Sequence, residues 1–119
     1  MADAKEQFYS DVSEADAEAA FSETRPLACN THYSVIGPPG WAESAFDGRR
    51  VFLLCTEDKG VPPAWQRSLM EESGVEWKVV ELKSGHSPFL SMPKETAEVV
   101  IGAVEGFRSA DVLVASKQA

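Results

Sequence analysis

The stretch VFLLCTEDKGVPPAWQRSLMEESGVEWKVVELKSGHSPFL, residues 51–90, decides the fold of this chain. It opens at 51–55 with an unbroken apolar run, which is typical of a parallel strand covered on both faces. The prolines at 62–63 suit the first turn of a helix, and Gly74 is placed to end it. A second strand is predicted at 77–82, so the stretch predicts a strand, a helix and a strand.

Short loops join these three elements, which has a consequence for the two strands. A strand–helix–strand connection is a right-handed crossover, so the strands are expected to be parallel neighbours in an α/β fold. Their carboxyl ends then face the same way, and the loops at 56–61 and 83–90 should lie side by side. In open α/β sheets this edge is where ligands and catalytic groups gather.

Each of these loops carries one side chain suited to proton transfer, Asp58 in the first and His86 in the second. A general base needs an imidazole in one tautomer, and a carboxylate bonded to one ring nitrogen fixes that tautomer. The spacing of the two residues also allows a plainer interpretation, in which Asp58 caps a turn and His86 is a loop residue in solvent. Spacing alone leaves both open.

Three motifs, CTEDKGVP at 55–62, WQR at 65–67 and GHSPFLSMP at 85–93, narrow the choice. Together they resemble the C-terminal part of an α/β-hydrolase, most closely the plant methylesterase and hydroxynitrile lyase group and its fungal relatives. The resemblance implies that Asp58 is the triad acid and His86 the triad base. It implies a C-terminal portion of the α/β-hydrolase fold: parallel strands with covering helices, plus part of a cap.

One position within these motifs bears on the reaction. Hydroxynitrile lyases of the group carry a lysine directly after the histidine, and here that position is Ser87. The resemblance therefore favours an esterase, with a small-molecule carboxylic ester as substrate, over a lyase. It leaves the substrate-binding residues unknown, although Phe21, Tyr33 and Trp41 of the cap are candidates to line an acyl or alcohol pocket.

The nucleophile of such a triad is not found in the sequence. Chain order in α/β-hydrolases is Ser, then Asp or Glu, then His, with the serine in a G-x-S-x-G elbow. The 119 residues contain no such motif and no Cys or Asp version of it. We therefore expect the isolated chain to be inactive, with a missing N-terminal half, a partner chain or self-association completing it. The alternatives are a truncated family member that acts as a binding or regulatory protein, and an unrelated binding domain whose Asp–His pair is accidental.

The resemblance divides the chain into a partial cap and connecting segment at 1–49, a hydrolase core segment at 50–108 and a tail at 109–119. A short acidic helix is expected at 13–21, begun by a capping box at Ser13. Ser91 is expected to cap a last helix with an apolar stripe.

Composition limits the remaining function classes. The chain is 44% hydrophobic with a formal charge of −8, and its pI is near 4.7. This charge would repel nucleic acid and anionic membranes, so neither is expected as a partner. The first twenty residues hold six acidic side chains and no apolar signal-peptide core, which favours a cytoplasmic protein.

The two cysteines, Cys29 and Cys55, have no spacing typical of a disulfide framework or a zinc site, and no metal or other cofactor is expected. Cys55 at the end of a strand is predicted to be a small buried hydrophobic residue rather than a nucleophile. Cys29 and His32 could meet on a helix, but no third ligand or orienting acid accompanies them, so the pair is interpreted as incidental.

Overall fold

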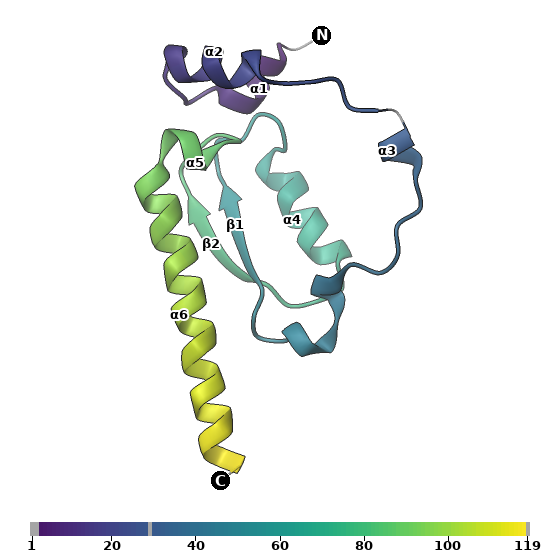
Figure 1. Cartoon of the computed structure of the whole chain (residues 1–119), viewed down its shortest axis with the longest axis vertical. Helices are drawn as coiled ribbons and strands as arrows, with labels where there is room; N and C mark the ends of the chain where they lie inside the picture. Colours follow the sequence, from purple (N-terminus) through teal and green to yellow (C-terminus); the bar gives the residue numbers. More distant parts are fainter. Residues whose placement is uncertain (1–2, 29, 119) are drawn as a thin grey trace.

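At the centre of the chain a parallel two-stranded sheet is held between two helices. The computed structural model describes residues 3–28 and 30–118, without the side chains of His32 and residues 110–118. Strand β1 (Val51–Cys55) pairs with β2 (Lys78–Leu82) in an unbroken parallel register. Helix α4 (Pro63–Glu72) connects the strands on one side of the sheet, and α6 (Pro93–Gln118) runs along the other (Figure 1). The predicted crossover is confirmed.

The ends of α4 follow from its sequence. Pro63 occupies the first turn, where a missing N–H costs nothing. Gly74 has a φ of 69°, a left-handed conformation that ends a helix readily because glycine has no Cβ. The Trp77 indole then donates to the Ser73 hydroxyl at 2.9 Å, which ties the end of the helix to the start of the next strand.

The C-terminal helices differ from the prediction. Ser91 does not cap the last helix; it is the final residue of a separate short helix, α5 (Pro88–Ser91). Pro88 and Pro93 each occupy a first helical turn, so two helices begin where one was expected. Helix α6 continues to Gln118 and so includes residues that the sequence assigned to a tail; Ala119 lies outside the described residues.

Two N-terminal helices lie over the carboxyl ends of the strands (Figure 1). Helix α2 (Glu14–Ser22) begins as predicted at Ser13, whose hydroxyl accepts the N–H of Asp16. Helix α1 (Ala4–Tyr9), which the sequence reasoning did not predict, begins at Asp3.

The connecting segment then runs the length of the molecule through three short elements to the amino end of β1 (Figure 1). These are α3 (Asn30–Tyr33) and the 3-10 helices η1 (Gly40–Ala42) and η2 (Ser44–Phe46).

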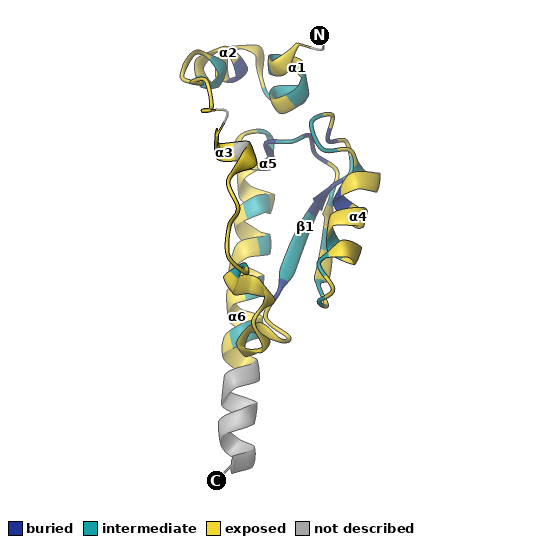
Figure 2. Cartoon of the chain, turned by 90° about the vertical axis from the view of Figure 1, so that its right-hand side faces the viewer, coloured by how far each residue is buried: buried dark blue, intermediate teal, exposed yellow. Residues whose placement is uncertain are grey.

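The hydrophobic core is small. Its buried hydrophobic residues, within the described part of the chain, are Ala17, Leu54 and Cys55. Much of the ribbon in Figure 2 is coloured as exposed. The radius of gyration is 17.4 Å, against about 13.5 Å for a compact domain of this length. The solvent-accessible surface is 8865 Å², where a compact protein of this mass would have about 6,300 Å². The sheet therefore carries less cover than its apolar strands call for.

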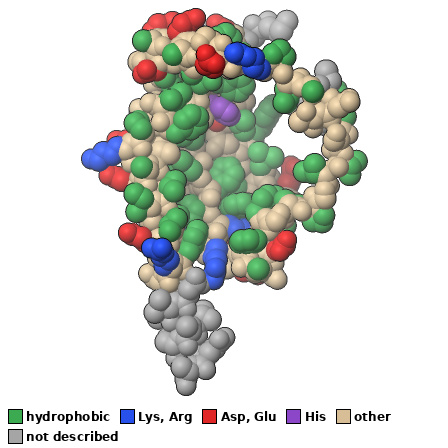
Figure 3. All heavy atoms as spheres, in the orientation of Figure 1, with side chains coloured by type: hydrophobic (Ala, Val, Ile, Leu, Met, Phe, Trp, Pro, Cys, Tyr) green, Lys and Arg blue, Asp and Glu red, His purple; other side chains and the backbone are tan. Residues whose placement is uncertain are grey.

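Side-chain chemistry is unevenly distributed over this surface. Figure 3 shows acidic side chains gathered on the N-terminal helices and hydrophobic side chains along the part of α6 before residue 110. In the part of the chain that the structure describes, no helix is long and apolar enough to cross a membrane.

Candidate active site

Asp58 is held in the loop after β1 by hydrogen-bond donors. It is 8% exposed. Its Oδ1 accepts the backbone N–H groups of Gly60 and Val61, both at 2.8 Å, and the Gln66 amide donates to Oδ2 at 3.4 Å. A carboxylate surrounded by donors is fixed in position and acts as an acceptor.

His86, in the loop after β2, meets this carboxylate directly. Its Nδ1 lies 2.9 Å from Asp58 Oδ2 and 3.0 Å from Oδ1. Because an ionised carboxylate only accepts, Nδ1 carries the proton in this contact and Nε2 is left as the acceptor of the neutral ring. The imidazole is one-third exposed, so Nε2 belongs to a ring that a reacting group can approach. The structure thus brings together the two residues that the sequence singled out, and their catalytic role remains a prediction.

Backbone hydrogen bonds continue past the strands and hold the two loops together. The Thr56 N–H donates to the Leu82 carbonyl, and the Glu57 N–H donates to the carbonyl of buried Ser84. Lys83 of the second loop also forms an ion pair with Glu57 of the first loop, at 3.6 Å. The loops therefore leave the sheet side by side, as the parallel topology predicts.

Gln66 of α4 supports the acid, and sequence reasoning assigned it no role. Its amide donates to the carbonyls of Cys55 and Val61, and its Oε1 accepts the Cys55 N–H at 3.0 Å. Gln66 is 5% exposed, so these hydrogen bonds replace the water that its amide would otherwise bind. A glutamine in the middle of an amphipathic helix was the only signal in the sequence.

Helix α1 and the turn between α1 and α2 contact both loops. The Phe8 ring packs against the His86 ring with centroids 5.0 Å apart. An Asp11 carboxylate oxygen accepts the Gly85 N–H at 2.6 Å, and Lys59 of the first loop pairs with Glu6. These partners are far apart in sequence, and no local pattern indicated them.

The remaining candidates do not join the Asp–His pair. Tyr33 is 84% exposed on the connecting segment, and Trp41 packs against Trp77 at the amino end of the sheet. Phe21 is half-buried in α2. Cys29 and the side chain of His32 lie outside the described residues, so the structure does not test their pairing.

Cys55 is buried, and burial raises the pKa of its thiol, while the Ser84 hydroxyl opposes that rise. A thiol held protonated is a poor nucleophile, which agrees with the prediction of a small buried hydrophobic residue. Among the described residues, no three His, Cys, Asp or Glu side chains gather as metal ligands.

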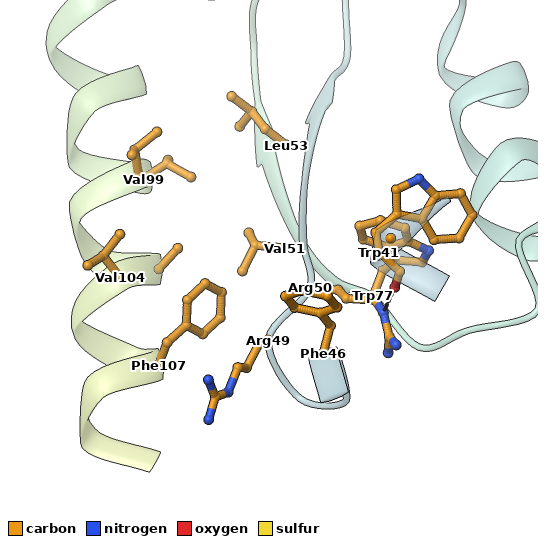
Figure 4. Close-up of a pocket in the computed structure, with 13 residues that line it drawn as sticks. Trp41, Phe46, Arg49, Arg50, Val51, Leu53, Trp77, Val99, Val104 and Phe107 are labelled. Atoms are coloured by element: carbon orange, nitrogen blue, oxygen red, sulfur yellow. Dashed lines mark hydrogen bonds between the residues drawn. The ribbon is translucent and has the colours of Figure 1, made fainter. Parts of the chain in front are cut away.

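An apolar cavity of about 550 Å³ opens on the α6 side of the sheet (Figure 4). Val51 and Leu53 of β1 face Val99, Val104 and Phe107 of α6 across it. Trp41, Phe46 and Trp77 line its end near the start of β1. The cavity thus lies on the sheet face and amino end, whereas Asp58 and His86 lie at the carboxyl end.

Buried Arg50 organises the wall of this cavity. Its guanidinium donates to the carbonyls of Trp41 and Glu43 and to the Asp47 carboxylate. With these acceptors its charge is satisfied within the fold, so its role is structural.

Comparisons with known proteins agree with this architecture. The structure matches that of polyneuridine aldehyde esterase with a TM-score of 0.65 and 24% identity, over 81% of this chain and 38% of that one. This likeness shows the fold. In sequence, 58 residues are 36% identical to norfluorocurarine synthase 2 of Strychnos sp, a match that spans 48% of this chain and 21% of that protein. The chain thus covers a minor part of both relatives.

The widest match is to a family rather than to a single protein. Residues 1–99 match the alpha/beta hydrolase family, which is most of the chain and includes the loops of Asp58 and His86. The predicted α/β-hydrolase fold is therefore confirmed. The chain belongs to the alpha/beta hydrolase family.

Proposed function

We propose that this chain supplies the acid and base of an esterase-type active site that cleaves carboxylic esters. The observation that carries the proposal is the contact of His86 Nδ1 with both carboxylate oxygens of Asp58, which leaves Nε2 as an acceptor. The name of polyneuridine aldehyde esterase, whose fold the chain shares, is consistent with ester cleavage. Ser87, which follows the base in place of a lyase-type lysine, points the same way.

In this reaction His86 Nε2 takes the proton of a serine hydroxyl as its oxygen attacks the ester carbonyl. Asp58 stabilises the imidazolium that forms. The bond to the alcohol oxygen then breaks, and the imidazolium gives its proton to that oxygen. The alcohol leaves, and the acyl group stays on the serine as an acyl-enzyme. Hydrolysis of the acyl-enzyme uses the same steps with water as the nucleophile. His86 accepts a proton from water as the water oxygen attacks the acyl group, and His86 then returns the proton to the serine oxygen as the acid leaves.

The serine and the oxyanion hole are proposed to come from a part that pairs with the second edge of β1. The ladder to β2 includes the Arg50 carbonyl, which accepts the Lys78 N–H, and the Thr56 N–H, which donates to Leu82. Backbone groups of alternate residues face the same edge of a strand. The even-numbered residues of β1 therefore face β2.

The odd-numbered residues face the other edge, and one of them already has a partner. Cys55 bonds Gln66 through both its N–H and its carbonyl. The backbone N–H and C=O groups of Val51 and Leu53 face the edge at which a further strand could pair. The side chains of both residues line the apolar cavity. A parallel strand paired here would lie beside that cavity and bury part of its apolar lining, and apolar burial is worth about 25 cal/mol per Å².

A binding or regulatory protein is the second candidate. The exposed apolar surface favours it, together with the absence of a G-x-S-x-G motif from the 119 residues. Such a protein would bind its partner through the same face, and His86→Ala would leave that binding unchanged.

Hydrolysis of a small chromogenic ester separates these candidates. We expect no turnover by the purified folded chain, because it lacks a nucleophile to activate. We expect turnover when the chain is fused behind the nucleophile-bearing portion of a family member in place of that member's own matching segment. In the active fusion, His86→Ala and Asp58→Asn should each lower kcat by about 10³–10⁴, and Lys83→Ala, an exposed change in the same loop, should not.

Two results would count against the proposal. Turnover by the isolated chain that both variants abolish would reveal a nucleophile within these residues. A folded, active fusion that tolerates His86→Ala would remove the base from its assigned role. Tight partner binding that survives His86→Ala without any turnover would favour the regulatory protein.

A further inference from the structure

We propose that Asp11 is a positioning residue for His86, and that it acts by holding the peptide that immediately precedes the base. The consequence for catalysis rests on the proposed function; the positioning itself does not. The N-terminal segment, which the sequence assigned to a partial cap, would in this way fix the geometry of the Asp58–His86 pair.

The contact is specific and short. Asp11 Oδ2 accepts the Gly85 N–H at 2.6 Å, across 74 residues of sequence. A bond from a backbone amide to a carboxylate is charge-assisted and stronger than one between neutral groups. Since Gly85 is bonded directly to His86, this bond fixes the peptide from which the imidazole projects.

Gly85 itself is shaped to this carboxylate. A Cβ built there would overlap Asp11 Oδ1, lie 2.9 Å from its Cγ and lie 3.1 Å from the Ser10 hydroxyl. The φ of Gly85 is not positive, so its backbone conformation is open to other residues. A Cβ at this position would displace the Asp11 carboxylate, so the close approach of Asp11 depends on the glycine at 85.

A second contact from the same helical pair reaches the ring. Phe8 packs on the imidazole, and its Cδ1 would also lie 3.3 Å from a Cβ built on Gly60, the residue whose N–H holds Asp58. Of the charged side chains here, Asp58 contacts the imidazole itself and Asp11, from the turn between α1 and α2, holds the preceding residue. The Lys59–Glu6 ion pair joins the first loop to α1. The N-terminal helices therefore support both members of the pair.

A displacement of about 1 Å in a catalytic group can lower a rate by about 10². Loss of the Asp11 bond should accordingly lower kcat of the completed enzyme more than it raises KM, because the base is misplaced while the substrate pocket is untouched. In the isolated chain the same loss should speed the hydrogen exchange of the residue 85 amide. It should also populate both tautomers of the His86 ring.

The test uses the isolated full chain and two NMR readouts: hydrogen exchange of the residue 85 amide, and the ¹⁵N shifts of the His86 ring. We expect Asp11→Ala to speed that exchange by about tenfold and to admit the Nε2–H tautomer. Asp11→Asn keeps an acceptor oxygen and should retain most of the protection. Glu18→Ala, which removes a charge from α2 without touching the loop, should change neither readout.

A double-variant comparison removes the remaining ambiguity. Gly85→Ala pushes the carboxylate aside and should reproduce the Asp11→Ala spectrum. In a chain that already carries Asp11→Ala, Gly85→Ala should have little further effect, because the carboxylate that it would displace is absent. Unchanged exchange and an unchanged tautomer in Asp11→Ala, or fully additive effects of the two substitutions, would overturn the proposal. These readouts need no turnover, so they stand even if the ester assay fails.

Discussion

The two ends of the sheet are built on opposite principles. At the carboxyl end, Asp58 is bonded by two backbone amides and by His86, and Gln66 ties the loop to the strand. At the amino end and along α6, apolar side chains surround a cavity of about 550 Å³. The first region satisfies the polar groups of Asp58 and Gln66 within the chain, whereas the second leaves apolar side chains exposed to solvent. From this contrast we propose that the Asp–His pair forms on its own and that a partner covers the apolar face.

Two adjacent leucines of β1 give the largest test of this contrast. Leu54 is fully buried, so Leu54→Ala should lower the free energy of unfolding by about 2–5 kcal/mol. Leu53 lines the cavity, so Leu53→Ala should cost about 1 kcal/mol or less in the isolated chain. Urea denaturation measures both. Equal losses would show that the cavity face is as well packed as the other, and the contrast would break.

Gln66 tests the polar end next. Gln66→Leu keeps most of the side-chain volume but leaves the Cys55 backbone groups and the Val61 carbonyl without their partner. We expect a loss of about 2–3 kcal/mol in unfolding free energy. Trp65→Ala is the matched control, since this neighbouring side chain is largely exposed and its loss should cost about 0.5 kcal/mol. A neutral Gln66→Leu would mean that water satisfies these groups equally well.

Two glycines should respond with opposite signs. A Cβ on Gly60 would lie 3.1 Å from His86 Nδ1 and 3.4 Å from Asp58 Oδ1, so Gly60→Ala should destabilise the chain by about 1 kcal/mol. Gly102 in α6 has open space around its position, so Gly102→Ala should stabilise by about 0.5–1 kcal/mol. Thermal unfolding followed by circular dichroism gives both signs, and two changes of the same sign would contradict the contrast.

Cys55 should give the smallest effect, as a dependence on pH. Burial disfavours the thiolate and raises the folded-state pKa of this thiol above its ordinary value. The unfolded chain therefore releases this proton first, and stability falls as pH rises above about 9. Cys55→Ala should flatten this part of the profile of unfolding midpoint against pH. A slope that survives the substitution would assign it to another group.

The central part of the fold could be predicted because its signals are local. An unbroken apolar run, paired prolines and one glycine define β1 and α4, and the crossover rule then brings the two loops together. That is why Asp58 and His86 could be named from sequence. Ser91 was misplaced because two prolines begin two helices where a single stripe suggested one.

The supports of the site could not be predicted, because their contacts are set by tertiary structure. Asp11 reaches Gly85 across 74 residues, and Phe8 reaches His86 from a helix that the sequence reasoning did not predict. Gln66 lies within the WQR motif at 65–67. A helical pattern does not show which polar side chain of the helix is buried against the sheet. The apolar cavity likewise depends on how α6 lies against β1, which periodicity does not specify.

The ring nitrogens of His86 in the isolated wild-type chain offer the most direct test of whether the Asp–His pair is complete without a partner. ¹⁵N NMR at a pH where the ring is neutral reports which nitrogen carries the proton. We predict a single tautomer with the proton on Nδ1, held by Asp58, and a bare Nε2, with Asp58→Ala releasing a mixture. A wild-type ring that is mainly protonated on Nε2, or a mixture that Asp58→Ala leaves unchanged, would contradict a preformed acid–base pair.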